Sequence, residues 1–219
     1  MSTRPKLSKR LQALVDFVPY ANVIADIGCD HAYVAISLIL NQKANFAYGI
    51  DNKEEPLKVA QYNVLSYHLG SSISLLKNPL NQPIHPCDGC IIAGVGKDVA
   101  VSIIDEFEPH LQKDAYVCLQ VNAQIIEMRI HMKARGYRLI NEVVVYDKKY
   151  YVILLYQKGD EVYDGVQLWI GPILLSKLAQ NKDYFIELKQ TASHFRAIAQ
   201  DQVKQSLYAS IDDYLQGIL

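Results

Sequence analysis

The sequence has little of several features that would mark a specialised class of protein. Its 219 residues include only 4 cysteines, too few for a disulfide scaffold, so we expect a reducing compartment and a cytoplasmic protein. Neither sign of charge dominates, because 22 Lys and Arg stand against 23 Asp and Glu, for a formal net charge of −1. That balance excludes a strongly basic nucleic-acid-coating protein but allows a local basic patch.

Long hydrophobic runs are also missing. The longest apolar stretch, around residues 32–40, is far shorter than the roughly 18–20 residues needed to cross a bilayer. The basic N-terminus has no hydrophobic segment behind it, so we expect neither a signal peptide nor membrane contact. Half of the residues are hydrophobic, which is enough for a packed core, and the length suits one full domain with an appendage.

Short apolar runs alternate with helical patterns through the first two thirds of the chain. The predicted strands are residues 23–27, 46–50, 73–76, 90–93, 115–121, 139–145 and 150–156. Between most of them, apolar residues three and four apart predict helices. This alternation predicts an α/β fold with a mostly parallel sheet. Only residues 146–149 separate the last two strands, so these should pair as an antiparallel hairpin.

A different pattern begins near Gly159. Residues 173–216 contain no glycine or proline, and their apolar residues keep a three-or-four spacing. We therefore predict a long helix that folds against a shorter helix at residues 173–179 as a helical hairpin. The expected domains are residues 1–159 and residues 160–219.

Polar residues follow the first two predicted strands, where parallel sheets bind their ligands. Gly28 ends the first strand, and a glycine lets the backbone approach a ligand closely. Asp26 and Asp30 place two carboxylates at the same turn. Asp51 ends the next strand, 23 residues after Gly28, where a carboxylate commonly accepts ribose hydroxyls.

The glycine pattern distinguishes between cofactors. Asp30 stands where the second glycine of a dinucleotide motif would fall, and two carboxylates would repel a pyrophosphate. S-adenosylmethionine carries a ribose and an adenine without phosphate, and its amino and sulfonium cations suit Asp26 and Asp30. We predict this cofactor, with a turn glycine between two solvated carboxylates as the alternative interpretation.

Five motifs occur in the order seen in one family. They are L-S-K-R-L from residue 7, A-D-I-G-C-D-H-A-Y from residue 25, A-G-V-G from residue 93, Q-V-N from residue 120 and G-P-I-L from residue 171. Through them the chain resembles the bacterial tRNA (adenine-N1)-methyltransferases that modify adenine 22, the TrmK family. The resemblance implies a class I, Rossmann-like S-adenosylmethionine-dependent methyltransferase domain followed by an α-helical hairpin domain that binds tRNA.

The resemblance also implies roles for individual residues. The residues expected at the cofactor are Asp26, Gly28, Asp30, Asp51, Asn52, Asn78, Ala93 and Gly94. The residues expected at the reacting adenine are Asp30, His31, Gln120 and Asn122. Gln120 and Asn122 would bond the adenine edge, His31 or Tyr33 would position or stack on the ring, and Asp30 would stabilise the developing positive charge.

Three residues depart from the family pattern at ligand-facing turns. Lys97 and Pro79 stand where the family has glycines, and Val121 replaces a proline. These departures leave two alternatives open. One is a methyltransferase of the same fold that acts on another RNA or a small molecule, and the other is a non-catalytic RNA-binding relative.

A C-x-x-C pair at Cys87 and Cys90 raises the question of a metal or redox site. The chain lacks the upstream H-x-E of zinc deaminases, and the pair opens a strand, whereas a redox motif opens a helix. We therefore interpret Cys90 as a buried apolar residue and expect no metal.

Two basic groups are candidates for binding tRNA phosphates. They are Arg4, Lys6, Lys9 and Arg10, and, later in the chain, Arg129, Lys133, Arg135 and Arg138. Tyr150 and Tyr151 are expected to face opposite sides of the hairpin, where either can stack on a base. We expect a monomer or a weak homodimer.

Overall fold

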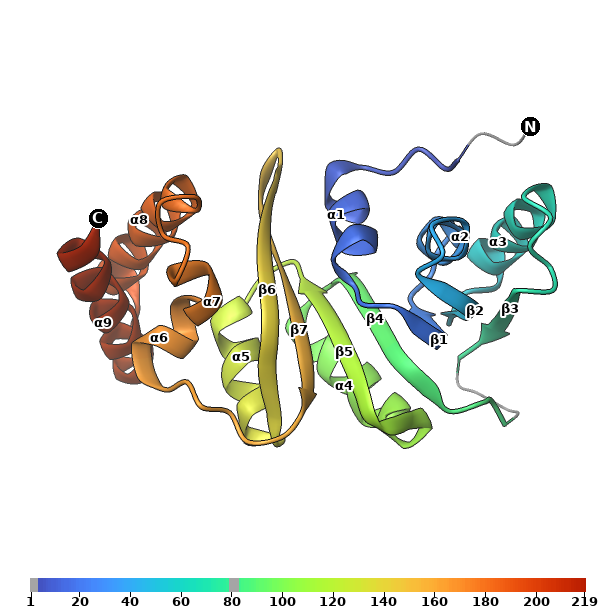
Figure 1. Ribbon diagram of the computed structural model, residues 1–219. Coiled ribbons are helices and arrows are strands. Elements are labelled where there is room, and N and C mark those ends of the chain that lie inside the picture. The colour runs from blue at the N-terminus through green and yellow to red at the C-terminus, as the bar shows by residue number, and fades with distance from the viewer. Residues whose placement is uncertain (1–3, 79–82) are drawn as a thin grey trace.

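The computed structural model describes residues 4–78 and 83–219, and one sheet runs through its centre (Figure 1). The sheet has seven strands in the order β3-β2-β1-β4-β5-β7-β6. They are β1 (Ala21–Ile27), β2 (Ala44–Asp51), β3 (Ile73–Lys77), β4 (Cys87–Val95), β5 (Leu111–Val121), β6 (Tyr137–Asp147) and β7 (Lys149–Lys158). Strands β1 to β5 pair in parallel, while β7 is antiparallel to both β5 and β6. The predicted mostly parallel sheet with a terminal hairpin is confirmed.

Helices cover both faces of the sheet. They are α1 (Lys9–Phe17), α2 (Tyr33–Leu40), α3 (Glu54–Ser66), α4 (Lys97–Phe107), the 3₁₀ turn η1 (Glu108–His110), α5 (Ile125–Ala134), α6 (Gly165–Ile170), α7 (Pro172–Leu175), α8 (Lys182–Ile198) and α9 (Gln202–Ile218). In the described part of the chain, no helix is long and apolar enough to cross a membrane.

The alternation of side chains along each strand supplies two cores. On β4, Ile91 points to the face covered by α1, α2 and α3, whereas Cys90 and Ile92 point to the face covered by α4, α5 and the C-terminal helices. All three side chains are buried, as expected for a parallel strand covered on both faces.

The strand order reverses between β1 and β4. From β1 the chain builds outward to β3 and then returns to form β4 on the other side of β1. At such a switch point the connections leave in opposite directions, which opens a crevice at the carboxyl ends of the two strands. This edge is where a ligand site is expected.

The C-terminal region differs from the prediction of one long helix. The predicted helix is divided into α8 and α9, and these two helices pack against each other as the hairpin. Ala199 adopts an extended conformation, and the Asp201 side chain accepts the backbone N–H of Lys204 at 2.8 Å, capping α9. Residues 173–179 were predicted to pack against the long helix. This segment instead includes the short helix α7, which packs on β6.

A buried ion pair joins the C-terminal region to the sheet. Arg129 of α5 and Glu142 of β6 are fully buried, with 2.6 Å between Nη2 and Oε2. Glu142 Oε1 also accepts the backbone N–H groups of Ile173 and Leu174, at 2.7 and 2.9 Å. Gly171 has φ +108°, and a Cβ there would lie 3.0 Å from Arg129 Nη2, so this junction requires glycine.

The second predicted phosphate-binding group is therefore mostly engaged within the protein. Arg129 is buried and paired, which contradicts its assignment as an RNA contact. Lys133 pairs with Asp164 at 3.1 Å, and Arg135 pairs with Glu108 at 2.5 Å. These cations neutralise neighbouring carboxylates and so contribute little positive potential at the surface.

Candidate active site

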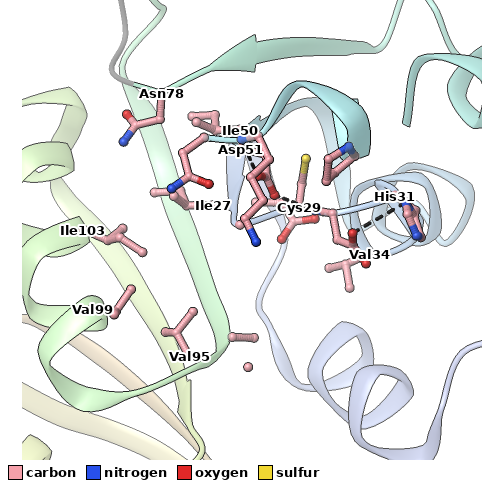
Figure 2. Close-up of a pocket in the computed structure, with 18 of the residues that line it drawn as sticks. Ile27, Cys29, His31, Val34, Ile50, Asp51, Asn78, Val95, Val99 and Ile103 are labelled. Atoms are coloured by element: carbon pink, nitrogen blue, oxygen red, sulfur yellow. Dashed lines mark hydrogen bonds and ion pairs between the residues drawn. The ribbon is translucent and has the colours of Figure 1, made fainter. Parts of the chain in front are cut away.

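A cavity of about 800 Å³ opens at the carboxyl edge of the sheet, over the switch point between β1 and β4 (Figure 2). Its walls come from the ends of β1, β2 and β4 and from the helices α1, α2, α3 and α4. All eight residues predicted at the cofactor line this cavity. The strand ends alone thus bring together residues spread from position 26 to position 94.

The turn after β1 forms the floor of the cavity. The backbone N–H groups of Gly28 and Cys29 donate to the carbonyl oxygen of Ile50, at 2.7 and 3.1 Å, which ties the turn to the end of β2. Gly28 has φ +79°, and a Cβ added there would meet no atom within 4 Å. The absence of a side chain at Gly28 therefore leaves open space against the backbone, as a closely held ligand requires.

Asp26 is a buried carboxylate with an unmet hydrogen-bonding need. Burial raises its pKa from the usual 3.8 to about 7, opposed by a backbone hydrogen bond from Ala35 and assisted by the charge of Asp51. Its Oδ2 is buried and has no hydrogen-bond partner in the protein. A buried carboxylate oxygen of this kind is stabilised by a cationic donor, so the site fits a ligand with an amino group at this position.

Asp51 organises the neighbouring loop. Its Oδ2 accepts the backbone N–H of Asp30 at 3.1 Å, and its Oδ1 accepts that of Lys53 at 3.0 Å. The carboxylate stays partly exposed at the cavity, and each oxygen keeps a lone pair for a second donor. A pair of neighbouring hydroxyls is a suitable ligand for it.

The far end of the cavity is polar on one wall. The backbone N–H of Asn78 donates to the carbonyl of Asp51 at 2.9 Å, and its side-chain amide donates to Glu106 Oε2 at 3.2 Å. Glu106, on α4, lines the cavity and was not identified from the sequence, because nothing in the helical pattern distinguishes it from a solvated residue. Pro79 lies outside the described residues.

The four residues predicted at the reacting adenine lie in two groups. Asp30 and His31 lie in the turn before α2, with 3.5 Å between Asp30 Oδ1 and His31 Nδ1. Figure 2 shows His31 on the opposite side of the cavity from Val99 of α4. Gln120 and Asn122 lie at the end of β5 instead, beyond β4. The tyrosine expected to stack, Tyr33, lies with His31 at a ring-centre distance of 6.3 Å.

Asn122 fastens the end of β5 to the end of β4. Its side-chain amide donates to the carbonyl of Gly94 at 2.6 Å, and its backbone N–H donates to that of Val95 at 2.9 Å. The Gln120 side chain is fully buried beneath Arg10, whose Nη1 donates to Gln120 Oε1. Arg10 also lines the cavity, a position that only the packing of α1 reveals.

A second, smaller cavity of about 150 Å³ lies beyond this wall. It is bounded by the turn from β5 to α5, by β7 and by α8, and Asn122, Tyr150, Tyr151 and Glu187 are among its lining residues. Tyr150 contacts Tyr184 of α8, at a ring-centre distance of 5.8 Å, while Tyr151 faces Arg10. The two tyrosines thus point to different neighbours, as their alternation predicts.

Two of the three departures from the family pattern, Lys97 and Val121, lie in the described part of the chain. Lys97 begins α4 and pairs with Asp98, with 2.7 Å between Nζ and Oδ1, so its charge is partly neutralised. Val121 is buried at the end of β5.

Cys87 and Cys90 are buried on β4, and burial raises the pKa of both thiols, that of Cys87 to about 12. Within residues 4–78 and 83–219, no cluster of three metal-ligating side chains occurs.

The chain is similar to known methyltransferases in both sequence and structure. The methyltransferase-domain family matches residues 7–154. The Bacillus subtilis tRNA (adenine(22)-N(1))-methyltransferase is 32% identical over 217 residues, covering 92% of this chain and 91% of its own. The crystal structure of the B. subtilis m1A22 tRNA methyltransferase TrmK is 26% identical, with a TM-score of 0.74 over 96% of each chain. A Streptococcus pneumoniae candidate tRNA (m1A22) methyltransferase, solved with S-adenosyl-L-methionine, is 25% identical, with a TM-score of 0.83 over 96% of this chain and 100% of that one.

Proposed function

The chain belongs to the family of bacterial tRNA (adenine(22)-N(1))-methyltransferases, and we propose that it transfers a methyl group from S-adenosylmethionine to N1 of adenine 22 in tRNA. One observation in the structure carries the cofactor assignment. Asp26 is a buried carboxylate whose Oδ2 has no partner, beside a glycine turn that leaves open space at the switch point. Such a site suits the amino group of an amino-acid-bearing nucleoside.

We assign the cofactor contacts along the edge of the sheet. Asp26, Gly28 and Asp30 receive the methionine end, whose amino group and sulfonium are cationic. Asp51, with Asn52 beside it, accepts the ribose hydroxyls, as a carboxylate at the end of the second strand commonly does. The remaining contacts lie around the adenine and the reacting end, and these are Asn78, Ala93 and Gly94.

The chain's own residues have a limited chemical task. N1 of a neutral adenine already carries a lone pair, so no strong base is needed. The cofactor supplies an activated methyl group. The protein must remove the adenine from its stack and hold N1 in line with that group. We assign the adenine edge to Gln120 and Asn122, and the stabilisation of positive charge to Asp30. His31 lies beside Asp30, and we assign His31 or Tyr33 to position the adenine ring or stack on it.

We further propose that residues 160–219 form a tRNA-binding domain. Buried residues of this region, such as Phe185 and Leu215, belong to the same apolar cluster as those of β4 and β5, so the region packs against the methyltransferase domain. The exposed Lys177 and Lys182 lie on this region. Exchanging both for Glu should weaken tRNA binding at least tenfold and leave cofactor affinity unchanged, as measured by filter binding and calorimetry.

The substrate also suggests where and how the protein works. Because tRNA is its substrate, we propose that it acts in the cytoplasm. We propose a monomer or a weak homodimer that uses no metal, which light scattering and elemental analysis of the purified protein would test.

The decisive experiment uses unmodified tRNA and labelled S-adenosylmethionine. We expect label in 1-methyladenine at position 22, and none when adenine 22 is replaced by guanine. Transfer to another nucleotide or to a small molecule would change the assigned substrate. Absence of cofactor binding by calorimetry would leave a non-catalytic RNA-binding protein.

A further inference from the structure

Arg10 of α1 reaches across the carboxyl edge of the sheet and lies beside the cofactor cavity. Its Nη1 donates to Gln120 Oε1, and its guanidinium carbon lies 5.5 Å from the centre of the Tyr151 ring. Its backbone N–H donates to Asp147 Oδ2 at 3.1 Å, which fastens α1 to the tip of the hairpin. A Cβ on Gly94 would lie 3.6 Å from Nη1, so the guanidinium also borders the end of β4.

The amide of Gln120 is held in one orientation. Its Nε2 donates to the carbonyl of Val121 at 2.9 Å and to Oδ1 of Asn122 at 3.3 Å. Both amide hydrogens are therefore engaged, and Oε1 is presented only as an acceptor. Because Gln120 is fully buried, this oxygen requires a donor, which Arg10 supplies.

We propose that Gln120 and Tyr151 form the subsite for the target adenine, and that Arg10 occupies it until tRNA binds. This inference rests on the proposed function. The guanidinium is planar, carries N–H donors and lies over an aromatic ring. Adenine is also planar, and its N6 amino group can donate to Gln120 Oε1 while the ring stacks on Tyr151. Guanine carries an acceptor at the corresponding atom, so the fixed orientation of Gln120 disfavours it.

The same arrangement favours the product-like state over the neutral base. In the reaction, N1 forms the new bond to the methyl carbon, and the electron pair of the broken carbon–sulfur bond stays on sulfur. The positive charge passes to the adenine, where it is shared between N1 and N6. A charged N6 donates a stronger hydrogen bond to Gln120, and a cationic ring binds more tightly over Tyr151. The subsite therefore binds the transition state better than the substrate.

Neighbouring charges agree with a site for cations. Lys149 Nζ lies 5.0 Å from the centre of the Tyr151 ring, so this ring already holds two cations in the free protein. When tRNA binds, Arg10 leaves the subsite and its guanidinium pairs with a phosphate near the target nucleotide.

The first test concerns the proposed hydrogen bond from the adenine N6 amino group to Gln120 Oε1, and it removes the donor and the acceptor separately and together. The substrates are tRNA with adenine at position 22 and tRNA with purine there, which lacks the N6 amino group. In the wild type, the change to purine should lower kcat/KM by about tenfold more than it does in Gln120→Met, which has no acceptor. Purine also alters N1 basicity, but equally in both enzymes. Equal losses in the two enzymes would overturn the assignment.

A second pair of variants covers the case in which Gln120→Met does not fold. Tyr151→Leu should lower kcat about tenfold with little change in KM for tRNA, because the ring acts on developing charge. Tyr151→Phe should restore most of that loss. Equal kcat values for the two variants would contradict a role for the aromatic face.

The displacement of Arg10 is tested by binding alone. We expect the salt dependence of tRNA affinity to become shallower in Arg10→Ala by roughly one phosphate contact, a slope change of about 0.7–0.9. Lys113→Ala is the matched control, since this exposed residue lies at the opposite end of β5. An unchanged slope in Arg10→Ala would overturn the displacement. Failure of the wild type to methylate adenine 22 would instead refute the proposed function.

Discussion

Replacing Asp26 by asparagine should make the cofactor-free protein more stable while destroying cofactor binding. Asp26 has its pKa raised from 3.8 to about 7 by burial, about three pH units. At about 1.36 kcal/mol per unit, the ionised carboxylate lowers the free energy of unfolding by about 4 kcal/mol. Asparagine has nearly the same shape and no charge, so the variant avoids this loss.

The pH dependence follows from the sign of the shift. Below about pH 4, Asp26 is protonated in both the folded and the unfolded chain, so wild type and Asp26→Asn should have similar stability. Between about pH 4 and pH 7, the unfolded chain ionises while the folded one stays protonated, and the wild type loses stability relative to the variant. Above about pH 7 the difference should be constant.

Urea unfolding at pH 5, 6, 7 and 8 without cofactor measures this difference. Between pH 5 and pH 8 the stability advantage of Asp26→Asn should grow by about 2–3 kcal/mol. Asp114→Asn is a control, because this exposed carboxylate lies near the start of β5. A difference that does not change with pH would refute the argument that burial raises the pKa of Asp26.

Calorimetry on the same proteins addresses the function of that carboxylate. We expect Asp26→Asn to lose S-adenosylmethionine binding by at least a hundredfold. In the wild type, affinity should rise with pH up to about 7, because the amino cation requires the ionised carboxylate. Retained affinity in the variant would mean that Asp26 does not face the amino group.

Three further perturbations probe the fold and the site. Arg129→Met should destabilise the protein by about 3–5 kcal/mol in urea unfolding, because it leaves Glu142 buried without its partner. The double variant Arg129→Met, Glu142→Leu should recover part of this loss. Equal stabilities of the single and double variants would contradict this prediction. Cys87 and Cys90 should react with a thiol reagent at pH 8 only after unfolding, since burial raises their pKa values, and rapid labelling of the native protein would show otherwise. Gly28→Ala should lower cofactor affinity at least tenfold, because the added Cβ would enter the cavity. It should also lower the free energy of unfolding by about 1–2 kcal/mol, because φ is +79°. Unchanged affinity by calorimetry would place the ligand elsewhere.

The sequence was sufficient to bring the residues expected at the cofactor to one edge of the sheet, because its signals are local. A buried strand followed by Asp26, Gly28 and Asp30, and a second strand ending at Asp51, place these residues at one edge of any parallel sheet. Their convergence around one cavity follows from the parallel sheet itself and does not depend on how the helices pack against it. The break between α8 and α9 was also encoded locally, by the capping residue Asp201, but the uninterrupted apolar spacing concealed it.

The remaining features depend on residues far apart in the chain. Arg10 meets Gln120 across 110 positions of sequence, and nothing in an amphipathic helix shows which basic residue will face inward. The Arg129–Glu142 pair likewise appears as two ordinary surface charges until α5 and β6 are packed together. Periodicity and capping determine each helix and strand because those forces act between neighbours in sequence. The tertiary structure alone decided that Arg10 contacts Gln120 and that Arg129 contacts Glu142. Such contacts depend on the strand order and on how the helices, including α1 against the hairpin, pack on the sheet.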